Sequence, residues 1–293
     1  MYYKLPNKMK KIINNIKNTF KRNMQTLAMT QKMKVPDIFL NFSKKKETDR
    51  KFQIISDIYI DTRQRNFLGD FIKIPVNSEK INLIIAGNIG DPHKEKYWNF
   101  INDCCEKYNK VFFTTGNREY WKNNKTIEET NEYINLNIQF NNLYFLNDDS
   151  HYCEKENFTI VGSTLWTPTQ NLDDIKNIKY FTNKLRNMKH KETIEYIESE
   201  CNFNSFDDTV KLNNHIKIVM SHNSPIKVLP NLKYFNKLHS NDFDYKIFKK
   251  IHLWVSGGPD KINFKYGTCS FKSNPVGHLS DEYTGYNDEI ICL

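Results

Sequence analysis

Seven residues with side chains that could bind metal ions or phosphate lie just past the ends of apolar runs rich in β-favouring residues. Carboxylates, amides and imidazoles bind metal ions, and an arginine side chain grips phosphate. Where such runs form adjacent strands of a layered fold, the residues past their ends meet at one rim, and binding sites form there. Turns also need Asp, Asn and Gly for backbone reasons, so strand-end position alone leaves a structural role open. The residues are Asp57, Tyr59, Asn88, Asn117, Arg118, His222 and Asp260.

The elements that would position these residues begin at Phe52, where short β-rich runs alternate with more polar segments. Continuous apolar runs indicate strands covered on both faces, and intervening helices indicate a layered α/β fold. Helices are expected within Trp98–Tyr108, Thr126–Ile138 and Asn183–Cys201. The expected strand runs, each with its turn, are KFQIISDIYI, INLIIAGNIGD, KVFFTTGNREYW, NLYFLND, FTIVGSTLWT, IKIVMSHNSP, IHLWVSGGPD, YGTCSFKSNP and EIICL.

Five short motifs occur in a specific order along these runs. SDIYID, AGNIGD, TGNRE, SHNSP and WVSGGPD resemble D-x-H, G-D, G-N-H-E, H and G-H-x-H, the metal-site motifs of the calcineurin-like metallophosphoesterases. The chain's last segment, from YGTCSF to EIICL, is similar to the closing segment of that family. The resemblance implies an α/β (α+β) four-layer fold over residues 51–293: a two-sheet β-sandwich flanked by helices, with the site on loops at one rim.

In that family, two divalent cations about 3.5–4 Å apart hold a phosphoester and a bridging hydroxide for in-line attack. Two neighbouring dications require a carboxylate that bridges them. Imidazoles fill most other positions, and a histidine near the leaving group helps to carry its charge.

The first two motifs keep only part of this set. Asp57 matches, but Tyr59 stands at a histidine position and Asn88 replaces the bridging aspartate. A neutral phenol is a poor ligand for Zn or Mn, although phenolate binds ferric iron. A carboxamide carries no charge with which to bridge two cations.

The remaining motifs depart further from the family pattern. Asn117 and His222 match, whereas Arg118 replaces the histidine near the leaving group. Gly258 and Asp260 stand where two histidine ligands belong.

This pattern of loss predicts that no dinuclear centre forms. The second metal position would keep Asn117, His222 and the shared Asn88, none of which is anionic. The first would keep Asp57 and gain Asp260. We therefore expect either no metal cofactor or at most one weakly bound Mg²⁺, Mn²⁺ or Ca²⁺.

Arg118 places a permanent positive charge where the cations would lie. It could grip a phosphate in bidentate fashion, or it could pair with Asp57 or Glu119 and neutralise the site. Structural roles also remain open for three candidate ligands: Asp57 as a turn cap, His222 as a core histidine and Asp260 as a turn residue.

The net charge of +9 is concentrated in residues 1–50, which hold 13 Lys/Arg and 3 Asp/Glu. The remainder holds 30 against 31, so its composition gives no case for nucleic-acid binding. Apolar residues recur at three- and four-residue steps in Met9–Met29, which predicts a basic amphipathic helix ahead of a linker at 41–51. This arm, residues 1–50, would pack on the main domain, contact an anionic surface such as a membrane or a nucleic acid, or serve as a targeting arm.

Composition also indicates the cellular compartment in which the protein is expected. The six cysteines form no C-x-x-C pair, which favours reduced thiols in a cytosol-like compartment. No apolar run is long enough for a transmembrane segment, and no signal-peptide pattern occurs. We expect an intracellular, cytoplasmic protein. The heavy use of Asn, Lys, Ile, Tyr and Phe is what an AT-rich genome would produce, which suits a large DNA virus or a protist. For a viral protein, the virion is an alternative location.

Three functions are compatible with these features. The preferred hypothesis is a pseudoenzyme: a phosphoesterase-fold protein with most or all hydrolase activity lost, kept as a binding or structural module for a protein partner or a phosphate-containing ligand. The alternative is a phosphomono- or phosphodiesterase that uses one weak metal ion, with Arg118 stabilising the phosphate. The third is binding of an anionic surface or nucleic acid through the arm.

Overall fold

The computed structural model describes residues 50–63, 72–168, 172–202, 215–226, 241, 243, 246–259, 261–278 and 286–293. All of them belong to one compact unit, Asp49–Leu293. The predicted basic arm, residues 1–50, lies outside this described part except for Arg50.

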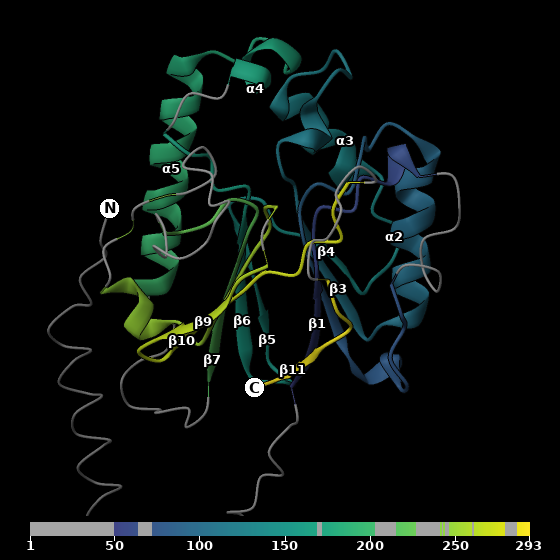
Figure 1. Ribbon diagram of the computed structural model, residues 1–293, viewed down its shortest axis with the longest axis vertical. Coiled ribbons are helices and arrows are strands. Elements are labelled where there is room, and N and C mark those ends of the chain that lie inside the picture. The colour runs from purple at the N-terminus through teal and green to yellow at the C-terminus, as the bar shows by residue number, and fades with distance from the viewer. Residues whose placement is uncertain are drawn as a thin grey trace, which may run out of the picture. The chain divides into compact units, whose positions relative to one another are not determined.

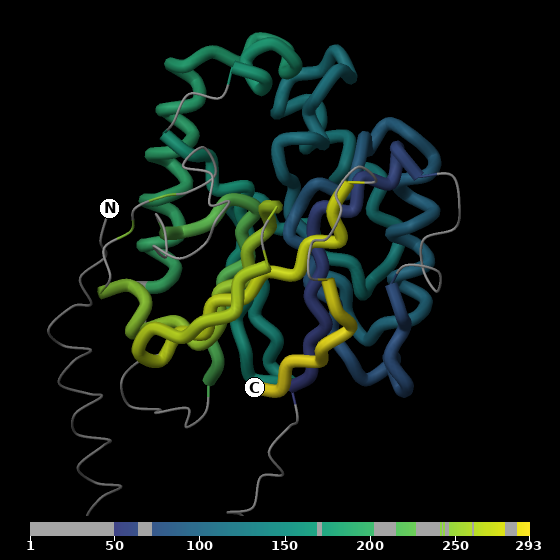
Figure 2. Tube along the Cα trace, in the orientation of Figure 1, coloured from purple at the N-terminus to yellow at the C-terminus, as the bar shows by residue number. Residues whose placement is uncertain are grey.

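The first sheet has five strands in the order β11, β1, β2, β3, β4 (Figure 1). Strands β1 to β4 run parallel, and β11 runs antiparallel to β1. Their bounds are β1 Lys51–Ile55, β2 Asn82–Ala86, β3 Lys110–Thr114, β4 Leu143–Phe145 and β11 Ile290–Cys292. The last strand of the chain therefore lies beside the first described one, as the yellow and purple segments of Figure 2 show.

The second sheet has six strands in the order β5, β6, β7, β8, β10, β9. The four central strands run parallel, and the two edge strands run antiparallel to their neighbours. Their bounds are β5 Asp149–Cys153, β6 Phe158–Ser163, β7 Ile216–Ser221, β8 Leu253–Ser256, β9 Asn263–Tyr266 and β10 Cys269–Lys272.

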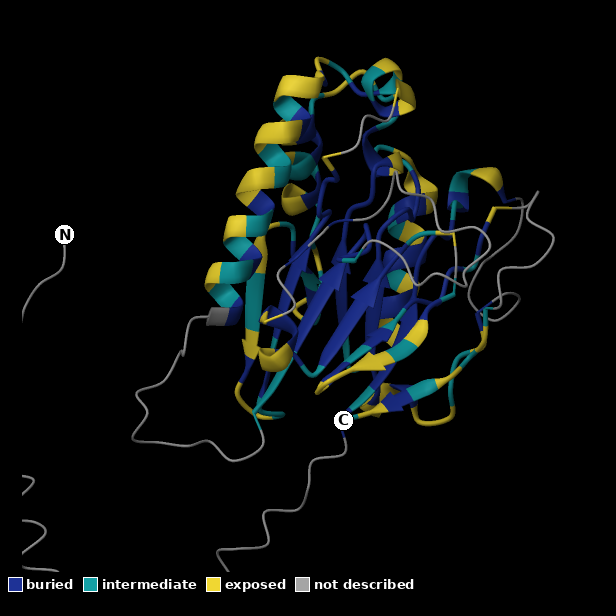
Figure 3. Ribbon diagram, turned by 60° about the vertical axis from the view of Figure 1, so that its left-hand side comes forward, coloured by how far each residue is buried: buried dark blue, intermediate teal, exposed yellow. Residues whose placement is uncertain are grey.

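The continuous apolar runs of the central strands supply side chains to two separate cores. In β1, Phe52 and Ile54 join the core between the sheets, together with Phe158 of β6. Ile55 points to the opposite face, where a helix covers the first sheet. Because alternate residues of a strand face opposite ways, a strand buried on both faces needs apolar residues at every position. Figure 3 shows the central strands buried and the outer sides of the helices exposed.

Helices cover both outer faces of the sandwich. Helix α2 packs Tyr97, Ile101 and Cys104 on the first sheet, and α5 packs Ile197 and Cys201 on the second. The α-helices are α2 Glu95–Lys107, α3 Ile127–Leu136, α4 Leu172–Asn177 and α5 Asn183–Asn202. Short 3-10 turns are η2 Ile60–Thr62, η3 Ser78–Lys80, η4 Arg118–Tyr120 and η6 Ile247–Lys250.

This two-sheet sandwich flanked by helices confirms the predicted fold. The three predicted helices are present as α2, α3 and α5, and α3 begins at a Thr126 capping box with Glu129. The edge strands β5 and β9 were not predicted, because neither forms an apolar run: most of β9 is exposed, and only Cys153 of β5 is buried. No helix in the described ranges is long and apolar enough to cross a membrane.

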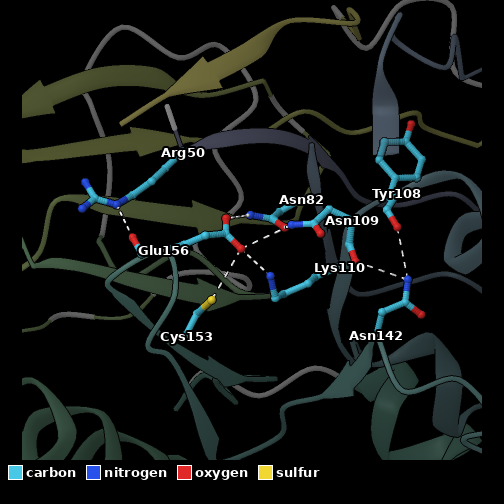
Figure 4. Close-up of polar contacts among 8 residues, drawn as sticks. All are labelled: Arg50, Asn82, Tyr108, Asn109, Lys110, Asn142, Cys153 and Glu156. Carbon is cyan, nitrogen blue, oxygen red and sulfur yellow. Dashed lines mark hydrogen bonds and ion pairs between the residues drawn. The ribbon is translucent and has the colours of Figure 1, made fainter. Parts of the chain in front are cut away.

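One polar cluster joins the two sheets at the end of the sandwich where β2 and β3 begin (Figure 4). Glu156, in the turn between β5 and β6, accepts hydrogen bonds from Asn82 (2.7 Å), Asn109 (3.3 Å) and the Lys110 ammonium. Burial opposes the charge of Glu156, but Lys110 and Asn82 hold its pKa below the ordinary value. The carboxylate therefore links the second sheet to the starts of β2 and β3.

Replacement of Glu156 by Gln should lower the free energy of unfolding by about 2 kcal/mol, because Lys110 loses its charged partner. Since the folded pKa of Glu156 is depressed, its contribution is full above the unfolded pKa of about 4.3 and disappears as pH falls through the folded value. Urea unfolding at pH 7 and below pH 4 measures both effects. Glu79→Gln, an exposed carboxyl in η3, is the control, and an equal loss in both variants would contradict the assignment.

Candidate functional site

The loops after β1, β2, β3, β7 and β8 meet at the opposite end of the sandwich, because these strands run parallel within their sheets. Backbone hydrogen bonds join the loops directly. The Asp57 amide donates to the Gly87 carbonyl at 3.0 Å, and the Gly257 amide donates to the Ser221 carbonyl at 3.0 Å. All the sequence-predicted positions except Asp260, which lies outside the described residues, are in these loops.

The Asp57 carboxylate is at the centre of this rim and is 2% exposed. Its Oδ1 atom accepts hydrogen bonds from the Tyr59 hydroxyl at 3.0 Å and the Asn88 amide nitrogen at 2.9 Å. Its Oδ2 atom accepts from the backbone amide of Gly258 at 2.8 Å. Three protein donors thus satisfy both oxygens of the carboxylate, and all three come from positions at which the family motifs have metal ligands.

Tyr59 acts as a neutral donor. Burial, followed by the neighbouring Asp57 carboxylate, raises the pKa of Tyr59 well above its ordinary value. The phenol keeps its proton at neutral pH and points it at Asp57. The phenolate that would bind ferric iron is therefore disfavoured at this position.

The orientation of the Asn88 side chain is fixed at both ends. Its nitrogen donates to Asp57, and its oxygen accepts from the Arg118 backbone amide at 3.0 Å. An amide flip would break both bonds, so the nitrogen rather than the oxygen faces the carboxylate. The side chain that stands in place of a bridging carboxylate is thus used as a hydrogen-bond donor.

The backbone of this centre is held in an uncommon conformation. Asp57, Tyr59 and Asn88 have φ angles of 52°, 51° and 56°, in the left-handed region. Non-glycine residues in this region cost free energy, and they concentrate at functional sites. Position 116 requires glycine, because the Cβ of any other residue would lie 2.3 Å from the Asn88 side-chain oxygen.

His222 is 2% exposed and is anchored through one nitrogen. Its Nδ1 atom lies 3.0 Å from the Ala86 carbonyl oxygen, which can only accept, so Nδ1 carries the proton. Among the described residues no hydrogen bond reaches Nε2. The ring thus ties the loop after β7 to β2 and leaves one acceptor nitrogen available.

Asn117 is bound to a polar cluster that the sequence did not reveal. Its amide donates to the Asp174 carboxylate at 2.8 Å, and the Trp121 indole donates to the same oxygen at 2.8 Å. The other Asp174 oxygen forms a buried ion pair with Arg186 at 2.5 Å. Asp174 and Arg186 come from α4 and α5, polar helical segments in which nothing marked them as part of the site.

The Arg118 side chain is exposed and lies over an aromatic ring. Its guanidinium carbon is 3.7 Å from the centre of the Trp121 ring and 5.8 Å from that of Tyr59. Neither pairing considered from the sequence is present in the described part: Asp57 is occupied as above, and Glu119 is fully buried. Glu119 instead accepts the amides of Ile89 (2.6 Å) and Gly116 (2.8 Å), which joins the loops after β2 and β3.

The donor set does not fit a dinuclear metal centre. Both oxygens of Asp57 already accept hydrogen bonds, Asn88 presents its nitrogen, and Tyr59 is a protonated phenol. Within the described ranges, no group of three or more His, Cys, Asp or Glu is placed to hold a metal ion. The chemistry of the residues present therefore supplies hydrogen-bond donors where the family supplies ligands.

The fold and the rim together define a phosphoesterase-type sandwich with an altered site. The profile described as "Calcineurin-like phosphoesterase" matches residues 50–258. The chain belongs to the calcineurin-like phosphoesterase family.

Individual proteins are also similar to this chain in sequence or in fold. An uncharacterised protein of Acanthamoeba polyphaga mimivirus is 26% identical over 246 residues, which cover 76% of this chain and 86% of that protein. Phosphopantetheinyl hydrolase from Mycobacterium tuberculosis has a similar fold, with a TM-score of 0.57 at 14% identity over 79% of this chain and 91% of its own. A protein of Thermus thermophilus covers the same shares at 13% identity with a TM-score of 0.45.

Replacement of Asn88 by Asp tests the hydrogen-bonded centre. The change removes the donor to Asp57 and buries a second carboxylate beside it. The free energy of unfolding should therefore fall by about 3 kcal/mol. Thermal and urea unfolding in metal-free buffer measure the loss. Asn124→Asp is a matched control, because Asn124 also has a left-handed backbone (φ 56°) but is exposed. A wild-type stability for Asn88→Asp would contradict the described geometry.

Proposed function

We propose that this chain is a phosphoesterase-fold protein without dinuclear metal catalysis, retained as a binding module. One observation carries the proposal: the Asp57 carboxylate is saturated by Tyr59, Asn88 and Gly258. A carboxylate whose two oxygens already accept three internal hydrogen bonds gains less from a cation, and the cation would have to break those bonds to reach it.

The catalytic prediction concerns metal content and turnover. Protein purified without chelator should contain far less than one equivalent of Mn, Fe or Zn per chain. It should not hydrolyse p-nitrophenyl phosphate or bis-p-nitrophenyl phosphate when Mn²⁺ is added. Elemental analysis and the two assays, with a metal-dependent family member as positive control, measure this. Stoichiometric metal together with turnover that disappears in Asp57→Ala would overturn the proposal.

The alternative enzyme is a hydrolase with one weak metal ion at Asp57 and Asp260, assisted by Arg118. Electrostatic stabilisation of a phosphoryl group by arginine is physically sound. The occupied oxygens of Asp57 argue against this alternative. The name of the Mycobacterium tuberculosis enzyme suggests no substrate for this chain, because a likeness at 14% identity carries the fold alone.

The exposed Arg118 supports a role in binding a phosphate-containing ligand. Its guanidinium is held over Trp121 and has no ion pair with any described carboxylate. A pre-positioned fork of donors can take two phosphate oxygens at once. The basic arm would add to the attraction of an anionic partner, through the salt-sensitive contacts expected of residues 1–50.

Phosphate binding can be followed through Trp121, whose ring underlies Arg118. Titration with a phosphomonoester should change tryptophan fluorescence in the wild type. The change should be lost in Arg118→Ala and reduced in Arg118→Lys, because lysine keeps the charge but not the bidentate fork. Lys80→Ala, a remote exposed lysine, should behave as wild type. An unaltered titration in Arg118→Ala would exclude Arg118 as the phosphate contact.

A further inference from the structure

A buried ion pair is bonded to the two residues that flank the exposed arginine of the rim. Asp174 of α4 and Arg186 of α5 are 2.5 Å apart, Oδ2 to Nη2, and their side chains are 3% and 2% exposed. We propose that this pair is a positioning element: it holds the Trp121 ring where the ring supports the Arg118 guanidinium, and it thereby sets the affinity of Arg118 for phosphate. The effect on affinity rests on the proposed function, whereas the placement of Trp121 does not.

One oxygen of Asp174 binds both ends of the turn that carries Arg118. The Asn117 amide nitrogen and the Trp121 indole nitrogen each donate to Asp174 Oδ1 at 2.8 Å. Asn117 and Trp121 are the residues on either side of the turn η4, which begins at Arg118. Hydrogen bonds to an ionised acceptor are stronger than those between neutral groups. A single carboxylate oxygen therefore fixes this short turn from both sides.

The Trp121 ring connects the ion pair to Arg118. The ring is half-buried, and one side of it packs against a buried cluster of aromatic and aliphatic side chains. The Arg118 guanidinium carbon lies 3.7 Å from the centre of the ring. Apolar packing is non-directional, so the hydrogen bond from the indole nitrogen to Asp174 is the contact that orients the ring. The cation–π contact with Arg118 depends on that orientation.

Arg186 is held by the same buried cluster as Trp121. Its guanidinium carbon lies 5.1 Å from the centre of the Phe181 ring and 5.7 Å from that of the Trp166 ring. Both rings belong to the cluster on which Trp121 packs. Arginine keeps its charge at every physiological pH, so Asp174 has a permanent counter-charge in a fixed place.

The counter-charge of Arg186 also matters for an anionic ligand. Asp174 is bonded to the ring that supports Arg118, so an uncompensated carboxylate there would attract the guanidinium and repel a phosphate. Asp174 and Arg186 together contribute no net charge. The positive charge of Arg118 therefore remains available to the ligand, while the Asp174 carboxylate still accepts the two hydrogen bonds that orient the turn.

A backbone hydrogen bond attaches the same turn to α4. The Lys122 amide, one residue after Trp121, donates to the Asn177 carbonyl at the end of α4 at 2.8 Å. The segment after η4 is thus bound to α4 through both main chain and side chains. A buried ion pair adds little stability over apolar residues of similar volume. Its presence here is better explained by the one arrangement of Trp121 and Asn117 that it fixes.

The first test follows the indole N–H resonances in the ¹H–¹⁵N spectrum of the full chain, without a ligand. The chain has four tryptophans, and the resonance that disappears in Trp121→Phe belongs to Trp121. In Asp174→Asn and in Arg186→Met this resonance should move upfield and exchange faster with water, because the charged acceptor is lost or displaced. An unmoved Trp121 resonance in both variants would overturn the proposal.

Two other tryptophans provide the control within the same spectrum. The Trp98 indole donates to the Pro92 carbonyl and the Trp254 indole to the Ser221 hydroxyl, each at 2.8 Å. Their resonances should stay in place in both variants. A displacement of these two as large as that of Trp121 would mean that the ion pair acts on the whole fold, and it would also overturn the proposal.

The second test measures the affinity for phenyl phosphate by isothermal titration calorimetry, which does not depend on tryptophan emission. Asp174→Asn should weaken binding by about three- to tenfold, the cost of ordering one long side chain that the wild type already holds in place. In an Arg118→Lys background, which keeps the charge but not the stacked fork, the same change should cost no more than about twofold. Fully additive losses would show that Asp174 does not act through Arg118.

Glu156→Gln is the matched control for a general loss of stability. It also removes the charge of a largely buried acid that pairs with a cation, Lys110, but at the opposite end of the sandwich. Its affinity for phenyl phosphate should stay within about twofold of wild type. Equal weakening by Glu156→Gln and Asp174→Asn would overturn the positioning role.

Two variants of Arg186 separate the charge of the pair from its shape. Arg186→Lys keeps the counter-charge and should lose no more than about threefold in affinity. Arg186→Met leaves Asp174 uncompensated and should lose about tenfold. Thermal unfolding confirms that each variant is folded. If Asp174→Asn does not fold, these two variants carry the test, and equal affinities in both would overturn the proposal.

The two tests distinguish this positioning role from the proposed function. If the wild type takes up no phenyl phosphate, phosphate binding at Arg118 fails, and the indole spectrum still decides whether the ion pair holds Trp121. If the wild type binds phenyl phosphate but neither the Trp121 resonance nor the affinity responds to Asp174→Asn, the proposed function stands and the positioning role is wrong.

Discussion

The arrangement of the rim loops depends on how the charge of one buried carboxylate, Asp57, is stabilised. Asp57 is nearly inaccessible to water, so its charge requires compensation within the protein. In the family pattern, cations provide it. Here a phenol, a carboxamide and a backbone amide do so, and because they belong to the loops after β1, β2 and β8, the same three bonds also hold those loops together. The loops are thus cross-linked by hydrogen bonds at positions where the family motifs have metal ligands.

The contacts around Asp57 follow from the orientation of the Asn88 side chain. With Asn88 turned toward Asp57, its oxygen is left to accept the Arg118 amide, which fixes the start of η4. Arg118 then extends outward over Trp121, and Trp121 and Asn117 are bound from below by Asp174 and its partner Arg186. A chain of buried polar contacts thus connects the loops after β1 and β3 with the helices α4 and α5. Such a network is strong only while every member has its partner.

Internal contacts hold the rim loops in place. The αL backbone positions fix the loops that carry Asp57, Tyr59 and Asn88, and the half-buried Trp121 packs against a buried cluster of aromatic and aliphatic side chains. Binding surfaces gain when ordering is completed in advance. A rim whose loops are already ordered suits the binding role proposed above.

The sequence by itself indicated a layered α/β fold, because strands buried on both faces are largely apolar. The resemblance of its five motifs to those of the family implied the two-sheet sandwich. It also located Asp57, Tyr59, Asn88, Arg118 and Gly258 at one rim. The sequence did not determine which hydrogen bonds and ion pairs those residues form with one another. Side-chain orientation within the site decides whether Tyr59 donates to Asp57. It also decides whether Arg118 pairs with Glu119. The exposed edge strands and the Asp174–Arg186 pair carry no periodic signal, and only the packing of α4 and α5 against the loops decided where these residues lie.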